Sequence, residues 1–235
     1  MQRFVGARRL PGTLCPTAQL MTSHFISPTF THEKLDAPSY ADLVDVFEDR
    51  TRHWLLEPAK HLLKSPHGVV AAVALSLGYF EGIEIYCSGE DSVGKSKEFF
   101  RRGFKRVFSA DPAGAHLYDE IIDALYVQAR CGFAHDGLFR NRVFFSDARP
   151  QPLTVTWPRR DGQFVKDGQL QSVVVNAALF CASIETHFGK YVSVLRAQSD
   201  PTLIANFQTA VGLKWGLNEP DRVIGMTERE FHGGA

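Results

Sequence analysis

The chain has 235 residues, of which 44% are apolar and 22% are charged, as expected for a soluble globular protein with a sizeable core. Basic and acidic side chains balance at 26 each, which excludes a globally basic nucleic-acid-coating protein and leaves only a local basic patch for such a partner. The four cysteines form no CxxC pair, so neither a zinc site nor a compact disulfide framework is indicated.

The N-terminal region is predicted to be a flexible leader over residues 1–36. Residues 1–32 contain arginines but no acidic residue, as a transit peptide does, although prolines interrupt any helix there. The longest apolar run, Val69 to Leu77 with Ser76 within it, is too short to span a bilayer. We therefore expect a cytoplasmic protein that needs no membrane, metal or cofactor.

Apolar residues at three and four spacing predict a helix from Tyr40 to Leu55, which Pro58 kinks or ends. Ser65 and Pro66 give a start signal for a mostly apolar helix that runs to Tyr86. Both patterns favour a helical bundle.

The next helix, Lys95 to Phe108, is amphipathic. Its outer face carries the basic residues Lys97, Arg101, Arg102, Lys105 and Arg106. They could track an RNA backbone, although charged outer faces are commonly only solvated. Asp111-Pro112 is then predicted to cap a helix that leads into Arg130.

Beyond Gly137 the period changes, and residues 143–146 and 153–157 resemble strands, with Asp161-Gly162 as a hairpin signal. We predict a small antiparallel meander, inserted at about 142–166. Helices are expected from Gly168 to Arg196 and from Pro201 to Leu213, before a C-terminal tail over 216–235. The predicted fold is mainly α, a single up-and-down helical bundle over 37–215 with this β insertion.

One motif resembles a nucleotide-binding loop. Gly89 to Ser96 matches the pattern G-x-x-x-x-G-K-S, in which a strand precedes the loop and the lysine reaches the phosphates. Glu90 and Asp91 place two carboxylates where phosphate would lie, and the segment before the loop continues a helical pattern. A P-loop nucleotide-binding protein is therefore the third-ranked function.

A second motif places Arg130 and His135 five residues apart near a helix end, followed by Gly137. Arginine binds phosphate bidentately, and histidine moves protons near neutral pH. The arrangement R-x4-H near a helix end, followed by a strand, resembles the HEPN (higher eukaryotes and prokaryotes nucleotide-binding) family. The resemblance covers about residues 40–195 and is most specific from Arg130 to Gly137.

The resemblance implies a metal-independent endoribonuclease, typical of toxins and phage defence. His135 would be the general acid or base and Arg130 would hold the scissile phosphate, giving 2',3'-cyclic phosphate ends from RNA but not DNA. Glu81, Glu84 and Asp136 are the expected supporting residues, although the two glutamates could equally pair with arginines inside the bundle. Many nuclease members have a polar residue where this chain has Cys131.

Alternatives remain at this stage. Some HEPN proteins only bind partners or RNA, and Arg130 and His135 could simply stabilise a helix terminus. An antitoxin or regulatory protein is a further expected partner. Residues five apart on a regular helix point about 140° from each other, so both lie on one face only if the helix ends or distorts between them. We therefore expect a homodimer with a composite site, with the helices over 112–130 and 168–196 at its interface.

Overall fold

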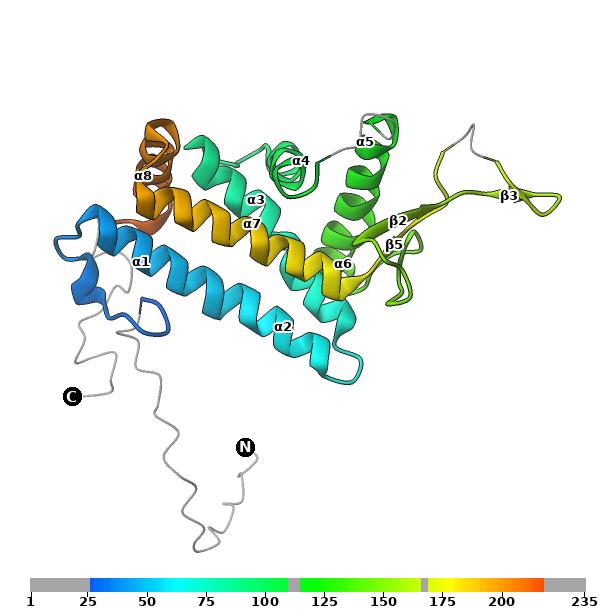
Figure 1. Ribbon diagram of the computed structural model, residues 1–235, viewed down its shortest axis with the longest axis horizontal. Coiled ribbons are helices and arrows are strands. Elements are labelled where there is room, and N and C mark those ends of the chain that lie inside the picture. The colour runs from blue at the N-terminus through cyan, green and yellow to red at the C-terminus, as the bar shows by residue number, and fades with distance from the viewer. Residues whose placement is uncertain (1–25, 110–114, 166–168, 218–235) are drawn as a thin grey trace, which may run out of the picture.

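The computed structural model describes residues 26–109, 115–165 and 169–217 (Figure 1). Within these ranges the chain forms six helical rods, a small mixed three-stranded sheet and a two-stranded hairpin. The predicted mainly α class is therefore confirmed. A short 3-10 turn, His32–Leu35, precedes the first rod, and the amide of Thr29 donates to Asp49 at 2.9 Å, which holds the described end of the leader against that rod.

The first rod contains α1 (Tyr40–Thr51), a π-helical turn (Arg52–Leu56) and α2 (Glu57–Lys64). Ser39 and Asp42 form a capping box at its start. Of the two outcomes predicted for Pro58, an end of the helix is wrong, because the helix continues to Lys64. In the π-helical turn the Glu57 amide donates to the Arg52 carbonyl, five residues earlier, so the change in hydrogen-bond pattern falls directly before the proline, which has no amide to donate.

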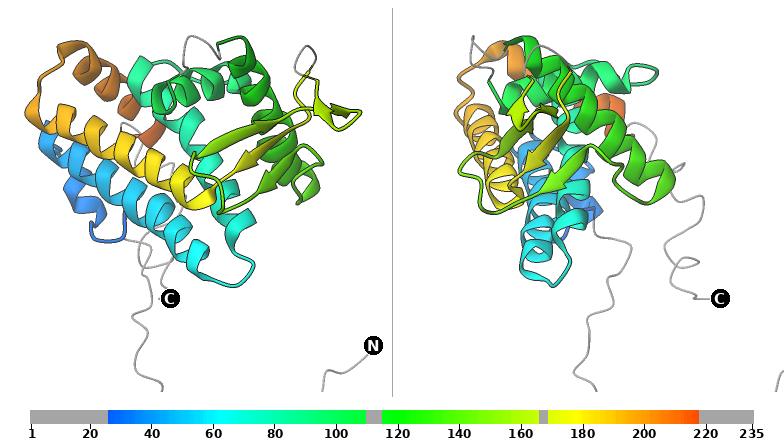
Figure 2. Two further views of the ribbon diagram at one scale, coloured as in Figure 1. Left: turned by 45° about the vertical axis from the view of Figure 1, so that its right-hand side comes forward. Right: turned by 90° about the vertical axis from the view of Figure 1, so that its right-hand side faces the viewer.

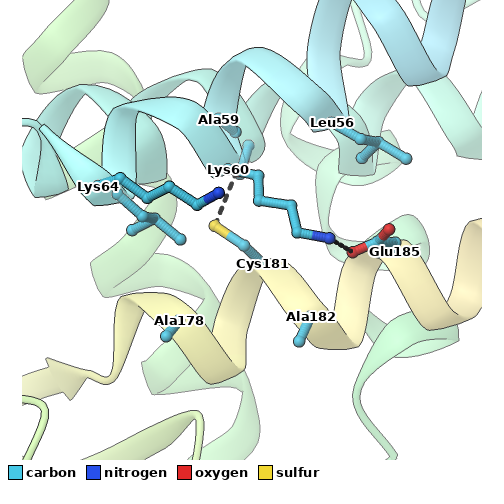
Figure 3. Close-up of a pocket in the computed structure, with 10 residues that line it drawn as sticks. Leu56, Ala59, Lys60, Lys64, Ala178, Cys181, Ala182 and Glu185 are labelled. Carbon is cyan, nitrogen blue, oxygen red and sulfur yellow. Dashed lines mark hydrogen bonds and ion pairs between the residues drawn. The ribbon is translucent and has the colours of Figure 1, made fainter.

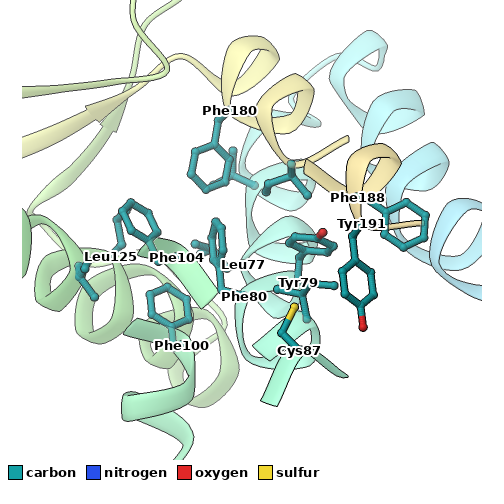
Figure 4. Packing of buried hydrophobic residues seen from close by; sticks show 14 of the residues in the cluster. Leu77, Tyr79, Phe80, Cys87, Phe100, Phe104, Leu125, Phe180, Phe188 and Tyr191 are labelled. Atoms are coloured by element: carbon teal, nitrogen blue, oxygen red, sulfur yellow. The ribbon is translucent and has the colours of Figure 1, made fainter. Parts of the chain in front are cut away.

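Helix α3 (Val69–Ser88) is the central element and packs against α4 (Ser96–Val107). The two backbones approach closely at Gly103, where an added Cβ would lie 1.9 Å from the Phe80 carbonyl oxygen. Fully buried aromatic rings fill the surrounding core, and Figure 4 shows several of them packed between α3, α4 and α7: Phe80, Phe100, Phe104, Phe180 and Phe188.

By length and composition α3 could also cross a membrane, although half of its most apolar window is buried inside the protein. Such burial is expected for the core helix of a bundle.

The rod that carries the Arg130 motif contains α5 (Ala115–Ala124), a second π-helical turn (Leu125–Cys131) and α6 (Gly132–Asp136). Gly137 ends it in the left-handed conformation, with φ of 71°. The predicted Asp111-Pro112 cap lies outside the described residues.

The sheet has the order β1 (Val143–Phe145), β5 (Ser172–Val175), β2 (Leu153–Thr156). It is not the predicted antiparallel meander, because β5 is parallel to β1 and antiparallel to β2. The prediction of a helix from Gly168 was wrong for the same segment. Its β-branched residues form a fully buried central strand, and helix α7 (Ala177–Ala197) begins only after Asn176, whose side chain caps it.

The hairpin signal at Asp161-Gly162 is confirmed. Strands β3 (Arg159–Arg160) and β4 (Gln163–Phe164) pair on either side of it, and both turn residues have positive φ. The last rod, α8 (Pro201–Trp215), is capped by Asp200. Figures 1 and 2 show α7 alongside the α1–α2 rod, with the sheet at one end of α7 and α8 at the other.

Candidate functional site

Arg130 lies in a hydrogen-bonded cluster that joins three helical rods. Its guanidinium contacts Glu81 of α3 at 3.1 Å. The Ser96 hydroxyl donates to the same carboxylate oxygen at 2.6 Å and accepts from the Tyr126 hydroxyl at 3.2 Å. The guanidinium also lies 5.7 Å from the centre of the Tyr126 ring. One third of the Arg130 side chain remains exposed, so a ligand can still reach it.

Of these partners, Glu81 was predicted to support the site, whereas sequence reasoning missed Ser96 and Tyr126. The available signals were indirect. Ser96 closes the G-x-x-x-x-G-K-S match, and Tyr126 lies one helical turn before the arginine. Only the packing of α3, α4 and the α5–α6 rod brings the four side chains together.

His135 is exposed in the last turn of the same rod. The rod does not end between Arg130 and His135, because the π-helical turn stops at Cys131 and α6 continues to Asp136. The distortion covers Leu125–Cys131, so it begins before Arg130 and ends one residue after it. The helix runs through Gly132 and ends at Gly137. Gly132 is buried, and an added Cβ would lie 2.8 Å from the Leu138 carbonyl oxygen, so this glycine allows the chain to fold back after Gly137.

Five steps of about 100° along a regular α-helix turn two side chains about 140° away from each other. A single chain therefore directs Arg130 toward Glu81 and His135 to a different side of the rod. An active site that uses both residues on one phosphate needs a second chain or a change in conformation.

Asp136, also expected to support the site, bonds instead to Arg140 at 2.6 Å on the exposed surface. The pKa of Asp136 is held below its usual value mainly by this bond and further by the nearby His135. Asp136 therefore keeps a negative charge beside the histidine.

Glu84 is buried and forms ion pairs with Arg106 and, at 3.1 Å, with Arg102 of α4. The sequence left open the alternative that this glutamate pairs with arginines inside the bundle. Glu84 was expected to support the site, and the structure places it in a core ion pair instead. The carboxylate raises the pKa of Arg106. Beyond this group, the Tyr79 hydroxyl and His187 Nδ1 lie 2.8 Å apart, and burial lowers the pKa of His187 to about 4.

The basic residues predicted to bind RNA are all engaged with carboxylates. Lys97 and Arg101 contact Asp123 at 3.2 and 2.9 Å, and Lys105 contacts Asp119 at 3.1 Å. Arg102 and Arg106 pair with Glu84, as described above. The outer face of α4 is therefore occupied by links to α5 and α3, and the structure gives it little free positive charge.

The segment that matches a nucleotide-binding loop lacks the required strand. Gly82 to Cys87, where the strand would lie, belongs to α3, and Gly89 is its C-terminal cap. Lys214 neutralises Asp91 at 2.6 Å, and Ser96 is bonded to Glu81. These contacts give the loop residues a structural role.

A cavity of about 220 Å³ lies between α2, α3 and α7 (Figure 3). Lys60 and Glu185 contact each other at 3.5 Å across it, and the Cys181 thiol lies 3.4 Å from the Ser76 hydroxyl. Burial raises the pKa of Cys181, which favours the thiol over the reactive thiolate. Among the described residues, no histidine lines the cavity.

The described residues contain no group of three or more histidine, cysteine, aspartate or glutamate side chains that could hold a metal ion. Comparison of the chain with protein-family models, curated protein sequences and solved structures gives no match.

Proposed function

We propose that this protein is an endoribonuclease of the HEPN type that acts as a homodimer and needs no metal. The observation that supports the proposal is the placement of Arg130 and His135 on one helical rod. The arginine is held by Glu81 at 3.1 Å, and the histidine is exposed one and a half turns later, at the end of the rod. This pair provides a phosphate-binding cation and a proton carrier.

In the proposed reaction His135 takes the proton from a ribose 2'-hydroxyl or gives one to the leaving 5'-oxygen. A positioned general acid or base contributes about 10² to 10⁴ in rate. Arg130 neutralises charge that builds up on the phosphate oxygens. The bond to Glu81 fixes the guanidinium before RNA arrives, and the partial exposure of Arg130 leaves donors free for the phosphate.

The angular separation of the two residues supports the homodimer. Because one chain points Arg130 and His135 to different sides, the proposed site combines the arginine of one protomer with the histidine of the other across a two-fold axis. Exposed apolar side chains on or directly after the rod could be covered in such an interface: Val127, Phe133 and Leu138 are 37%, 40% and 69% exposed.

A non-catalytic module that binds RNA or a partner protein, such as an antitoxin or regulator, is the second candidate. The bond between Arg130 and Glu81 favours it, because this bond already uses part of the arginine's charge. The two candidates differ in whether His135 is needed for any measurable chemistry.

The test is incubation of purified protein with end-labelled RNA in EDTA. Wild-type protein should cut the RNA to 2',3'-cyclic phosphate ends, and Arg130→Ala or His135→Ala should lower the rate by at least about 100-fold. The exposed His61 of α2 and the ion-paired Arg196 of α7 provide matched controls. His61→Ala and Arg196→Ala should cut normally. Equal rates in wild type and both site variants would end the nuclease proposal.

A further inference from the structure

Among the described residues, the β region carries exposed positive charge that no carboxylate pairs. Between Arg140 and Val165 the chain has five arginines, two aspartates and no lysine or glutamate. Arg140 is paired with Asp136, and Arg142 donates to the carbonyls of Leu170 and Gln171. The other three arginines, Arg149, Arg159 and Arg160, are exposed and form no ion pair with any described residue.

Two of these arginines lie on an arm that stands away from the rest of the molecule. Figure 1 shows the β3–β4 hairpin as a ribbon that continues from β2 and projects beyond the helices. The Val165 amide donates to the Pro158 carbonyl at 2.8 Å, which closes the base of the hairpin. The hairpin follows β2 directly in the chain, and the three-stranded sheet that contains β2 packs against the Arg130 rod.

The arm also presents aromatic surface beside its charges. Phe164 is 50% exposed, and the Arg159 guanidinium lies 4.3 Å from the centre of its ring. Trp157 is partly exposed at the start of the hairpin. Cations that contact phosphates next to rings that stack on bases form the usual surface for binding a single nucleic-acid strand. A protein partner would instead be favoured by an apolar patch with few charges at its centre.

We propose that the β3–β4 hairpin is the arm that binds single-stranded RNA. Arg159 and Arg160 contact backbone phosphates, and Phe164 stacks on a base. This inference rests on the proposed function, because it delivers RNA to the Arg130 and His135 site of the same protein. It replaces the outer face of α4, whose basic residues are taken by Asp119, Asp123 and Glu84.

The test measures binding of a fluorescein-labelled single-stranded RNA in a His135→Ala background, where cutting is blocked, over a series of salt concentrations. Two double variants each remove two positive charges: Arg159→Gln with Arg160→Gln on the arm, and Lys97→Gln with Lys105→Gln on α4. Each phosphate contact contributes about 0.7 to the slope of log affinity against log salt for single strands. The arm variant should therefore reduce the slope by about 1.4, and the α4 variant should leave it unchanged.

A third variant, Phe164→Ser, should weaken binding roughly tenfold without changing the slope, because stacking is not a charge effect. Equal slopes for the two double variants, or no RNA binding at all, would overturn the inference. The outcomes separate it from the nuclease proposal. If wild-type protein binds RNA through the arm but never cuts it, the inference about the arm stands and the nuclease proposal fails. If the protein cuts RNA but the arm variant has the same salt slope as wild type, the nuclease proposal stands and the inference about the arm fails.

Discussion

The close contact between α3 and α4 can be tested at Gly103. In Gly103→Ala the new Cβ would lie 1.9 Å from the Phe80 carbonyl oxygen and 2.7 Å from its carbon. Both atoms belong to the backbone, so no side-chain rotation relieves the overlap, and the helices must move apart by more than about 1 Å. Overpacking of this kind costs about 3 kcal/mol, and the higher helix propensity of alanine offsets about 1 kcal/mol. The free energy of unfolding should fall by about 2 kcal/mol.

The assay is urea unfolding followed by circular dichroism. Gly82→Ala is the matched control, since Gly82 also lies within α3 and an added Cβ there meets nothing within 4 Å. That variant should be up to about 1 kcal/mol more stable than wild type. Similar unfolding midpoints for Gly103→Ala and Gly82→Ala would refute the proposed packing of α3 on α4. The contact also holds Ser96 against Glu81, so Gly103→Ala should disturb the Arg130 cluster.

Three further predictions concern stability and ligand binding. The pKa of His187, lowered to about 4 by burial and by Arg106, lies below the ~6.5 of an unfolded histidine. Between these pH values the unfolded chain binds more protons than the folded chain. The free energy of unfolding should therefore fall by up to about 1.4 kcal/mol per pH unit as pH is lowered from 6.5 toward 4. The variant His187→Gln should remove this dependence on pH. Asn176→Ala loses the cap of α7 and a 2.7 Å bond to the Arg149 carbonyl and should cost about 2 kcal/mol in urea unfolding; an unchanged midpoint would contradict the assigned cap. Lys95→Ala should leave calorimetric titrations with ATP and GTP as flat as those of wild type, and magnesium-dependent binding lost in this variant would restore the nucleotide-binding hypothesis.

The helices were predictable where local patterns and tertiary packing agree. Apolar residues at three and four spacing identified α1, and the start signal at Ser65 and Pro66 with the apolar run after it identified α3. Residues 172–175 were misassigned, because a short apolar run fits a buried strand as well as a helix start. Three successive valines favour the strand, and it forms because β1 and β2 supply hydrogen-bonding partners on both sides.

The candidate site was predictable in its residue types but not in its contacts. Arg130 and His135 follow from a local motif. The bond between Arg130 and Glu81, by contrast, joins residues 49 positions apart. Contacts between distant residues were also missed for the basic residues on the outer face of α4. Their spacing predicted an outward face, but the sequence could not show that the aspartates of α5 lie opposite it.

The central claim is that RNA is cut at a site built from Arg130 of one protomer and His135 of another. The most direct test mixes separately purified Arg130→Ala and His135→Ala proteins under conditions of subunit exchange, followed by cutting of labelled RNA in EDTA. Each mixed dimer has one intact site, and random exchange makes about half of the dimers mixed, so the mixture should regain about a quarter of wild-type activity. A mixture that stays inactive, while wild-type protein treated in the same way cuts RNA, would contradict the composite site.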